Sequence, residues 1–120
     1  MMKLKVNIIA DKPTVNDRIY TREVLEEALL RNETFSIVLD KSHNLKIDVK
    51  DIIATTKTCE MNDTGEIFIT IDKVINSTLG KILKQDILLG FFGVGEVKEN
   101  FVKNFHILTF YPVMTEYEGG

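Results

Sequence analysis

The segment NDRIYTREVLEEAL, residues 16–29, joins a polar turn to an amphipathic helix. Thr21 is a suitable N-cap because its hydroxyl can accept a hydrogen bond from a backbone N–H of the first turn, and Glu23 lies near the positive end of the helix dipole. Apolar residues recur at helical spacing on one face, namely Val24, Leu25, Ala28 and Leu29. We therefore predict a helix that begins after Thr21, covers a sheet with this face and ends near Asn32.

Strand patterns lie on both sides of this helix. Residues 4–8 alternate between apolar and polar side chains, which predicts a half-buried strand. Residues 35–39 (FSIVL) are short, apolar and rich in β-branched side chains, as in a buried strand. Residues 46–60 predict one or two further strands, with a bulge or break near Asp51.

The second half of the chain predicts a hairpin and then a second helix. Gly65, in the turn MNDTG at residues 61–65, can take a positive φ, and the alternating residues beyond it complete the hairpin. Residues 76–78 (NST) offer N-caps for a helix whose apolar face comprises Leu79, Ile82, Leu83 and Ile87. Gly80 within it costs about 1 kcal/mol relative to alanine, so we expect this helix to be short or to begin late.

The chain then predicts two closing strands. Residues 90–95 (GFFGVG) form an apolar segment interrupted by glycine, and a polar turn surrounds residues 98–100. Residues 105–111 predict a last strand that is apolar on both faces and closed by Pro112, followed by a loose tail at residues 116–120. The order predicts one α+β domain over residues 1–120, a mostly antiparallel sheet or partly closed β-barrel with two main helices.

Composition narrows the class of protein. The net charge is −3 and no run of Lys and Arg occurs, so non-specific nucleic-acid binding is disfavoured. Cys59 is the single cysteine, which fits a reducing compartment and a small buried apolar residue. No apolar run approaches the roughly 20 residues that cross a bilayer, and the first residues lack a signal-peptide core. We expect synthesis in the cytoplasm and no membrane partner.

Few residues suggest catalysis. His43 is the best candidate base because imidazole titrates near neutrality and the residue lies in a predicted loop, although a solvated loop histidine is the commoner case. Ser42 is adjacent to it but points elsewhere in an extended loop, and Ser36 and Ser77 have structural explanations. The Gly93–Gly95 pair matches no phosphate-binding motif, and the scattered aspartates match no metal loop. We therefore predict no cofactor and no metal.

Several segments resemble a known family in order and spacing. They are residues 16–29, His43 after a strand, Ile47-Asp48, residues 80–83 (GKIL) and residues 105–112. Together they resemble the head-maturation (prohead) serine proteases of tailed bacteriophages, which are related in fold to herpesvirus assembly proteases. The resemblance extends from about Val6 to Pro112.

One departure decides what this resemblance implies. The family carries its nucleophile in a Gly-x-Ser-Ser-Arg-Gly-like setting, whereas this chain has GFFGVG at residues 90–95. Without the serine no acyl intermediate can form, and loss of a nucleophile costs many powers of ten in rate. The resemblance therefore implies a non-catalytic, minor structural protein of the phage capsid, found in the virion and, during assembly, in the host cytoplasm.

Such a protein would bind the major capsid protein, further copies of its own chain or scaffold proteins, and it would do so through sheet edges or apolar patches. The candidate contact residues are aromatic, namely Phe91, Phe92, Phe110, Tyr111 and Tyr117. The alternative for Phe91 and Phe92 is burial in the core. Two other functions stay open: an active assembly protease that uses Ser36, Ser42 or Ser77 with His43, and a small binding module unrelated to phage heads.

Overall fold

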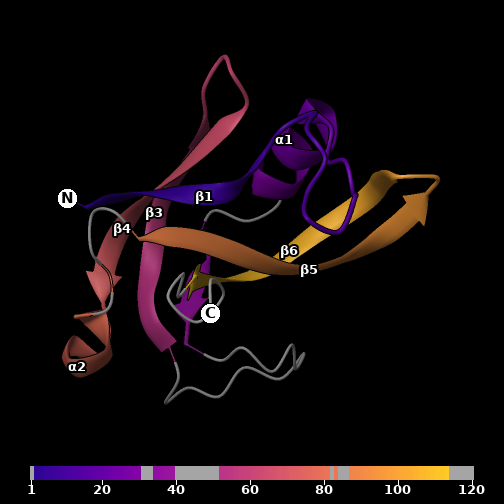
Figure 1. The fold of residues 1–120 in the computed structure, drawn as a ribbon. Coiled ribbons are helices and arrows are strands. Elements are labelled where there is room, and N and C mark those ends of the chain that lie inside the picture. Colours follow the sequence, from indigo (N-terminus) through magenta and orange to yellow (C-terminus); the bar gives the residue numbers. More distant parts are fainter. Residues whose placement is uncertain (1, 31–33, 40–51, 82, 84–86, 114–120) are drawn as a thin grey trace.

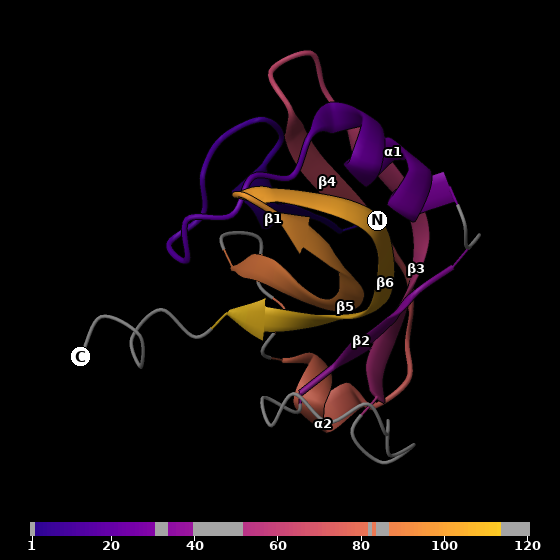
Figure 2. The same ribbon diagram turned by 90° about the vertical axis from the view of Figure 1, so that its right-hand side faces the viewer.

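Six strands form a closed barrel in the order β1-β4-β3-β2-β6-β5. The computed structural model describes residues 2–30, 34–39, 52–81, 83 and 87–113. Along the chain the elements are β1 (Lys3–Ile9), α1 (Arg22–Leu30), β2 (Ser36–Val38), β3 (Ile52–Met61), β4 (Glu66–Val74), α2 (Ser77–Gly80), β5 (Leu88–Lys98) and β6 (Phe101–Val113). Figure 1 shows α1 at one end of the barrel and α2 at the other, and Figure 2 shows β6 curving around the barrel.

Two parallel pairings close the barrel. The neighbouring pairs β1–β4, β3–β4, β2–β3 and β5–β6 are antiparallel. The β5–β6 hairpin then joins the other four strands through parallel contacts, β5 with β1 and β6 with β2. The predicted β-barrel is therefore confirmed, but it is closed rather than partly closed and its sheet is mixed.

The prediction of two main helices is wrong, because α2 has a single turn of four residues. The Gly80 N–H donates to the Asn76 carbonyl at 2.7 Å, and the chain then enters a turn at Lys81. A Cβ at Gly80 would lie 2.6 Å from Val74 Cγ1, so the residue that weakens the helix also allows its close contact with the end of β4. Leu83 is buried, as predicted, but lies beyond the helix.

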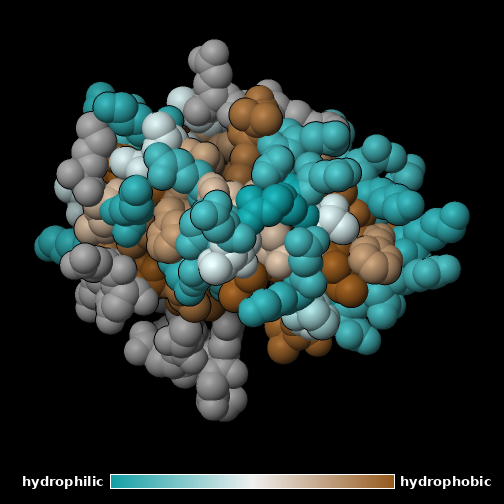
Figure 3. Space-filling model, turned by 90° about the horizontal axis from the view of Figure 1, so that it is seen from above, coloured by the Kyte–Doolittle hydropathy of each residue, from teal (hydrophilic) through white to brown (hydrophobic). Residues whose placement is uncertain are grey.

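The predicted start and apolar face of α1 are confirmed. Thr21 Oγ1 accepts from the Val24 N–H at 3.3 Å, which is the expected N-cap interaction. Leu25, Ala28 and Leu29 are buried, and Val24 is half-buried against the core. Figure 3, seen from the side that carries α1, shows a mostly hydrophilic surface with apolar residues exposed between polar ones. Among the described residues, no helix is long and apolar enough to span a membrane.

The predicted β3–β4 hairpin is confirmed, with one continuous strand on each side. Asn62 Oδ1 accepts from the backbone N–H groups of Thr64 and Glu66 at 3.1 and 2.8 Å, and Gly65 has φ +87°. The register of β3 with β4 shifts between Thr55 and Thr58. The bulge or break predicted near Asp51 falls on residues 46–51, which lie outside the described residues. Cys59, on β3, was predicted to be buried and is half-buried against the core, and burial raises the pKa of its thiol to about 11.

The last strand is longer than predicted. β6 runs from Phe101 to Val113, and Pro112 lies within it, paired in register with Leu89, instead of closing it. Its first half is not apolar on both faces: Phe105 and Ile107 are buried while His106 and Leu108 are exposed. The core receives buried apolar side chains from all six strands and from α1.

Candidate functional site

The barrel wall opens between β1 and β5. These parallel strands pair at two positions, Lys5 with Leu88 and Val6 with Leu89, and no further pairing between them occurs among the described residues. Beyond that point the two strands separate, as Figure 1 shows. A groove of about 760 Å³ lies there, lined by the end of β1, by the loop at residues 12–18 and by Phe91, Phe92 and Gly93 of β5.

Backbone hydrogen bonds fix the 12–18 loop beside the groove. The Thr14 N–H donates to the Arg18 carbonyl at 2.9 Å, and Thr14 Oγ1 accepts from the Arg18 N–H at 3.2 Å. Asp17, with φ +62°, donates its N–H to the Thr14 carbonyl and so completes the turn. Ile19 then bridges to Phe101 at the edge of β6. The segment before α1 is therefore held between β1 and the β5–β6 hairpin.

Three aromatic rings form the inner wall of the groove. Tyr20 lies edge-to-face against Phe91, with ring centroids 5.4 Å apart, and against Phe105 at 5.1 Å. Phe91 and Phe105 are 5.3 Å apart. Such pairs stabilise by about 0.5–1.5 kcal/mol beyond their burial. Burial raises the pKa of Tyr20 and outweighs the opposite effect of the nearby Arg18 charge. The phenol therefore stays neutral at physiological pH.

Glycine lets β6 aromatic rings lie directly on β5. A Cβ at Gly93 would come within 2.3 Å of Phe105 Cζ and 2.4 Å of the His106 carbonyl oxygen. A Cβ at Gly90 would come within 2.6 Å of Tyr111 Cζ. The sequence GFFGVG is therefore a packing motif in which absent side chains make room for rings.

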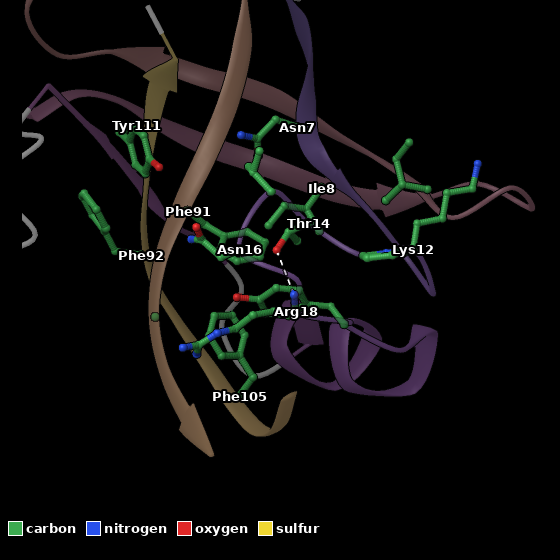
Figure 4. A pocket seen from close by; sticks show the side chains of 15 residues that line it. Asn7, Ile8, Lys12, Thr14, Asn16, Arg18, Phe91, Phe92, Phe105 and Tyr111 are labelled. Carbon is green, nitrogen blue, oxygen red and sulfur yellow. Dashed lines mark hydrogen bonds between the residues drawn. The ribbon is translucent and has the colours of Figure 1, made fainter. Parts of the chain in front are cut away.

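The polar groups that line the groove include cations and amides but no carboxylate. Asn7 belongs to β1, while Lys12, Asn16 and Arg18 belong to the loop. In Figure 4 the side chains of Asn7, Asn16 and Arg18 extend toward β5, whereas Lys12 points away from it. Among the described residues, the Arg18 guanidinium takes part in no salt bridge. The groove is locally positive although the whole chain has a net charge of −3.

The residues proposed for catalysis are not brought together in the described part of the chain. His43 and Ser42 lie outside the described residues. Ser36 is half-buried in β2, paired with Thr55, and Ser77 begins α2. No group of three or more His, Cys, Asp or Glu side chains within the described ranges could hold a metal ion.

The aromatic contact candidates have different environments. Phe110 is fully buried, so its ring is not available to a partner. Phe91 is half-buried in the inner wall of the groove. Phe92 is also half-buried and stacks on Tyr111, with centroids 4.5 Å apart, at the rim. Tyr117 lies outside the described residues, as does the predicted loose tail at residues 116–120.

Arg18, Asn7 and Asn16 line the groove but were not candidate binding residues from the sequence. For Asn16 and Arg18 the sequence gave only an indirect indication of a binding role, because both belong to the segment that carries the family resemblance. For Asn7 the sequence indicated only a position in a strand and no binding role.

We find no protein-family model, no curated protein and no solved structure that matches this chain.

Proposed function

We propose that the protein is a non-catalytic capsid-associated protein of a tailed bacteriophage, which binds the major capsid protein through the surface of its barrel. The resemblance to prohead proteases supports the phage head as its setting. The replacement of the Ser-Ser-Arg part of the family setting by Phe92, Gly93 and Val94 supports binding rather than cleavage.

The packing of β5 is the observation that carries this proposal. The two serine positions of the family setting fall on Phe92 and Gly93. Phe92 stacks on Tyr111, and even a Cβ at Gly93 would overlap Phe105 and the His106 carbonyl. This part of the chain is therefore adapted to hold aromatic rings, and a serine at Gly93 would require β5 and β6 to move apart.

The segments that resemble the family also contact each other. Tyr20, from residues 16–29, packs on Phe91 and Phe105, and Ile19 bridges to Phe101. Aromatic side chains are enriched in protein interfaces relative to the rest of the surface. The groove and its rim are accordingly the part of the barrel that we assign to partner binding.

Association with the capsid can be tested on particles. Mass spectrometry of purified virions from the phage that encodes this chain should detect it, and it should co-sediment with shells assembled from the major capsid protein alone. A Phe92→Ala/Tyr111→Ala variant should co-sediment less, while Lys57→Gln, which changes an exposed residue of β3, should be unaffected. A chain that is absent from virions and does not co-sediment with shells contradicts the proposal.

A fluorophosphonate probe tests the competing protease function. The purified protein should not be labelled, because the family's nucleophile position carries no hydroxyl. Labelling that is lost in Ser36→Ala, Ser42→Ala or Ser77→Ala, and also in His43→Ala, would establish a serine hydrolase instead.

A further inference from the structure

We propose that the groove between β1 and β5 binds the last residue of a partner protein, with its terminal carboxylate at Arg18 and an aromatic side chain against the rings of the inner wall. This inference deepens the proposed function and rests on it only in taking a protein as the ligand. Its test uses short peptides and no capsid, so either proposal can fail while the other holds.

Backbone pairing closes the groove at both ends, which is the first reason. At one end β1 pairs with Leu88 and Leu89 of β5. At the other end the Ile19 N–H donates to the Asn100 carbonyl at 2.7 Å, and the Ile19 carbonyl accepts from the Val102 N–H at 3.0 Å. A chain that passed straight along β5 would have to break one of these pairings. A chain end can enter from the solvent side without breaking either.

The position of the cation is the second reason. Arg18 directly precedes Ile19, so it lies beside one closed end, and its side chain extends toward β5 (Figure 4). Among the described residues it takes part in no salt bridge. Asp17 precedes it in the chain but is not among the lining residues, which include no carboxylate. A guanidinium binds a carboxylate with two parallel hydrogen bonds, so a negatively charged chain end fits where the groove stops.

The inner wall is the third reason, and it selects the side chain of the last residue. Tyr20 and Phe91 are half-buried and line the groove, and both rings contact the buried Phe105. Because these rings already hold one another in place, binding against them requires little additional ordering. Aromatic rings prefer edge-to-face or offset contacts with each other. A phenylalanine or tyrosine at the end of the partner chain therefore suits this wall.

The amides of the groove favour a chain end over a free aromatic acid. The Asn7 and Asn16 side chains extend toward β5, and each carboxamide can both donate and accept. The last residue of a protein offers a main-chain N–H and the preceding C=O beside its carboxylate, whereas a free acid offers neither. The groove volume of about 760 Å³ also exceeds what one side chain fills. The ligand that uses the whole lining is thus the end of a polypeptide.

Two matched peptides test this directly. We would titrate the isotope-labelled full-length protein with acetyl-Gly-Val-Phe that ends in a free carboxylate and with the same peptide that ends in an amide, and record backbone amide shifts by NMR. The free-acid peptide should bind with a Kd below about 1 mM and shift the amides of residues 7–9, 16–18 and 91–93. The amidated peptide should bind at least about tenfold more weakly, because it lacks the charge that Arg18 binds.

Two further ligands separate a chain end from other sources of a carboxylate. Acetyl-Gly-Glu-Phe-amide keeps one negative charge and the ring but moves the charge to an internal side chain. The acid 3-phenylpropanoate keeps the carboxylate and ring of a terminal phenylalanine but lacks its amide. Both should bind several-fold more weakly than the free-acid peptide. Equal binding of the first would indicate recognition of an internal segment, equal binding of the second would indicate a site for small acids, and either result overturns the proposal.

Protein variants test the role of Arg18. Arg18→Gln should remove most of the preference for the free acid over the amide, and Arg18→Lys should keep part of it, since lysine retains the charge without the paired donors. Lys57→Gln, a control that removes an exposed charge from β3, should keep the full preference. Circular dichroism should show that all three variants are folded, since both side chains are exposed. The proposal is overturned by a Kd above about 1 mM for the free acid, by equal binding of acid and amide, by an unchanged preference in Arg18→Gln, or by shifts confined to other surfaces.

Discussion

The two antiparallel hairpins of the barrel hold their strands together by different means. The β3–β4 hairpin closes through a polar turn in which Asn62, Thr64 and Glu66 bond to one another, and its core residues are mainly aliphatic. The β5–β6 hairpin instead fits aromatic rings onto glycines. The first arrangement depends on residues that are close in sequence, and the second on contacts between β5 and β6.

Phe105→Ala should have the largest effect, because it removes a ring that supports the β5–β6 hairpin. Phe105 is buried and contacts both Tyr20 and Phe91. Loss of a buried phenylalanine costs about 3–5 kcal/mol in the free energy of unfolding. Urea denaturation would measure it, with Leu108→Ala on the exposed face of β6 as a control that should cost about 0.5 kcal/mol or less. Similar costs for the two variants would argue against an aromatic support for this hairpin.

Gly93→Ala should cost about 1–3 kcal/mol through overpacking. The new Cβ would overlap both the Phe105 ring and the His106 carbonyl oxygen, and the backbone atom cannot move without disturbing the β5–β6 pairing. Gly95→Ala is the matched control, because its nearest contacts would be 3.0–3.2 Å and smaller adjustments would relieve them. If Gly95→Ala costs as much as Gly93→Ala, a general strand effect of glycine replacement explains both.

Gly65→Ala tests the corresponding position in the β3–β4 turn. A positive φ costs an L-residue about 1–2 kcal/mol, and the new Cβ would lie 2.9 Å from Ala10 Cβ. The double variant with Ala10→Gly removes the contact with Ala10 Cβ but keeps the backbone strain and the contacts with the Ala10 backbone N and O, at 3.1 and 3.2 Å. Thermal unfolding of the single and double variants should therefore show partial rescue. Full rescue would assign the whole effect to the Cβ contact, and no rescue would assign it to φ and the backbone contacts.

The sequence predicted the locally determined features well. Thr21 as the N-cap of α1 and the turn before Gly65 depend on neighbouring residues, and both are confirmed. Helix α2 is short, as the cost of Gly80 predicted, but the apolar pattern after Ser77 led to the wrong prediction of a second main helix. The parallel pairing of Val6 with Leu89 joins distant parts of the chain, so no local pattern reveals it.

The groove was harder to predict for the same reason. It exists because β1 and β5 separate after two pairings, a property of the barrel rather than of either segment. In the sequence, Arg18 has the features of an ordinary exposed arginine, and its position in the groove depends on the turn that Thr14 and Asp17 form. Residues 90–95 drew attention through their glycines, but the rings that explain those glycines come from β6.

The smallest expected effect concerns the dependence of stability on pH in the β3–β4 turn. Hydrogen bonds from Lys5, Asn62 and Thr64 lower the pKa of Glu66 from 4.5 to about 2. A carboxyl with a lowered folded-state pKa contributes stability above its unfolded pKa, and that contribution is lost as pH falls through the folded value. The melting temperature should therefore fall between pH 4.5 and about pH 2, and this fall should be shallower in Glu66→Gln.

Glu60→Gln provides the control for this measurement, because Glu60 lies in the same hairpin and both side chains of its ion pair with Lys3 of β1 are exposed. Its melting temperature should follow the wild-type pH profile, and a profile as shallow as that of Glu66→Gln would place the effect outside the turn. Gly93→Ala should lower the melting temperature by a similar amount at every pH in this range, since its overlap involves no proton. A steeper acid dependence in Gly93→Ala would mean that the two hairpins are coupled, and that β5 and β6 help to hold the Glu66 turn in place.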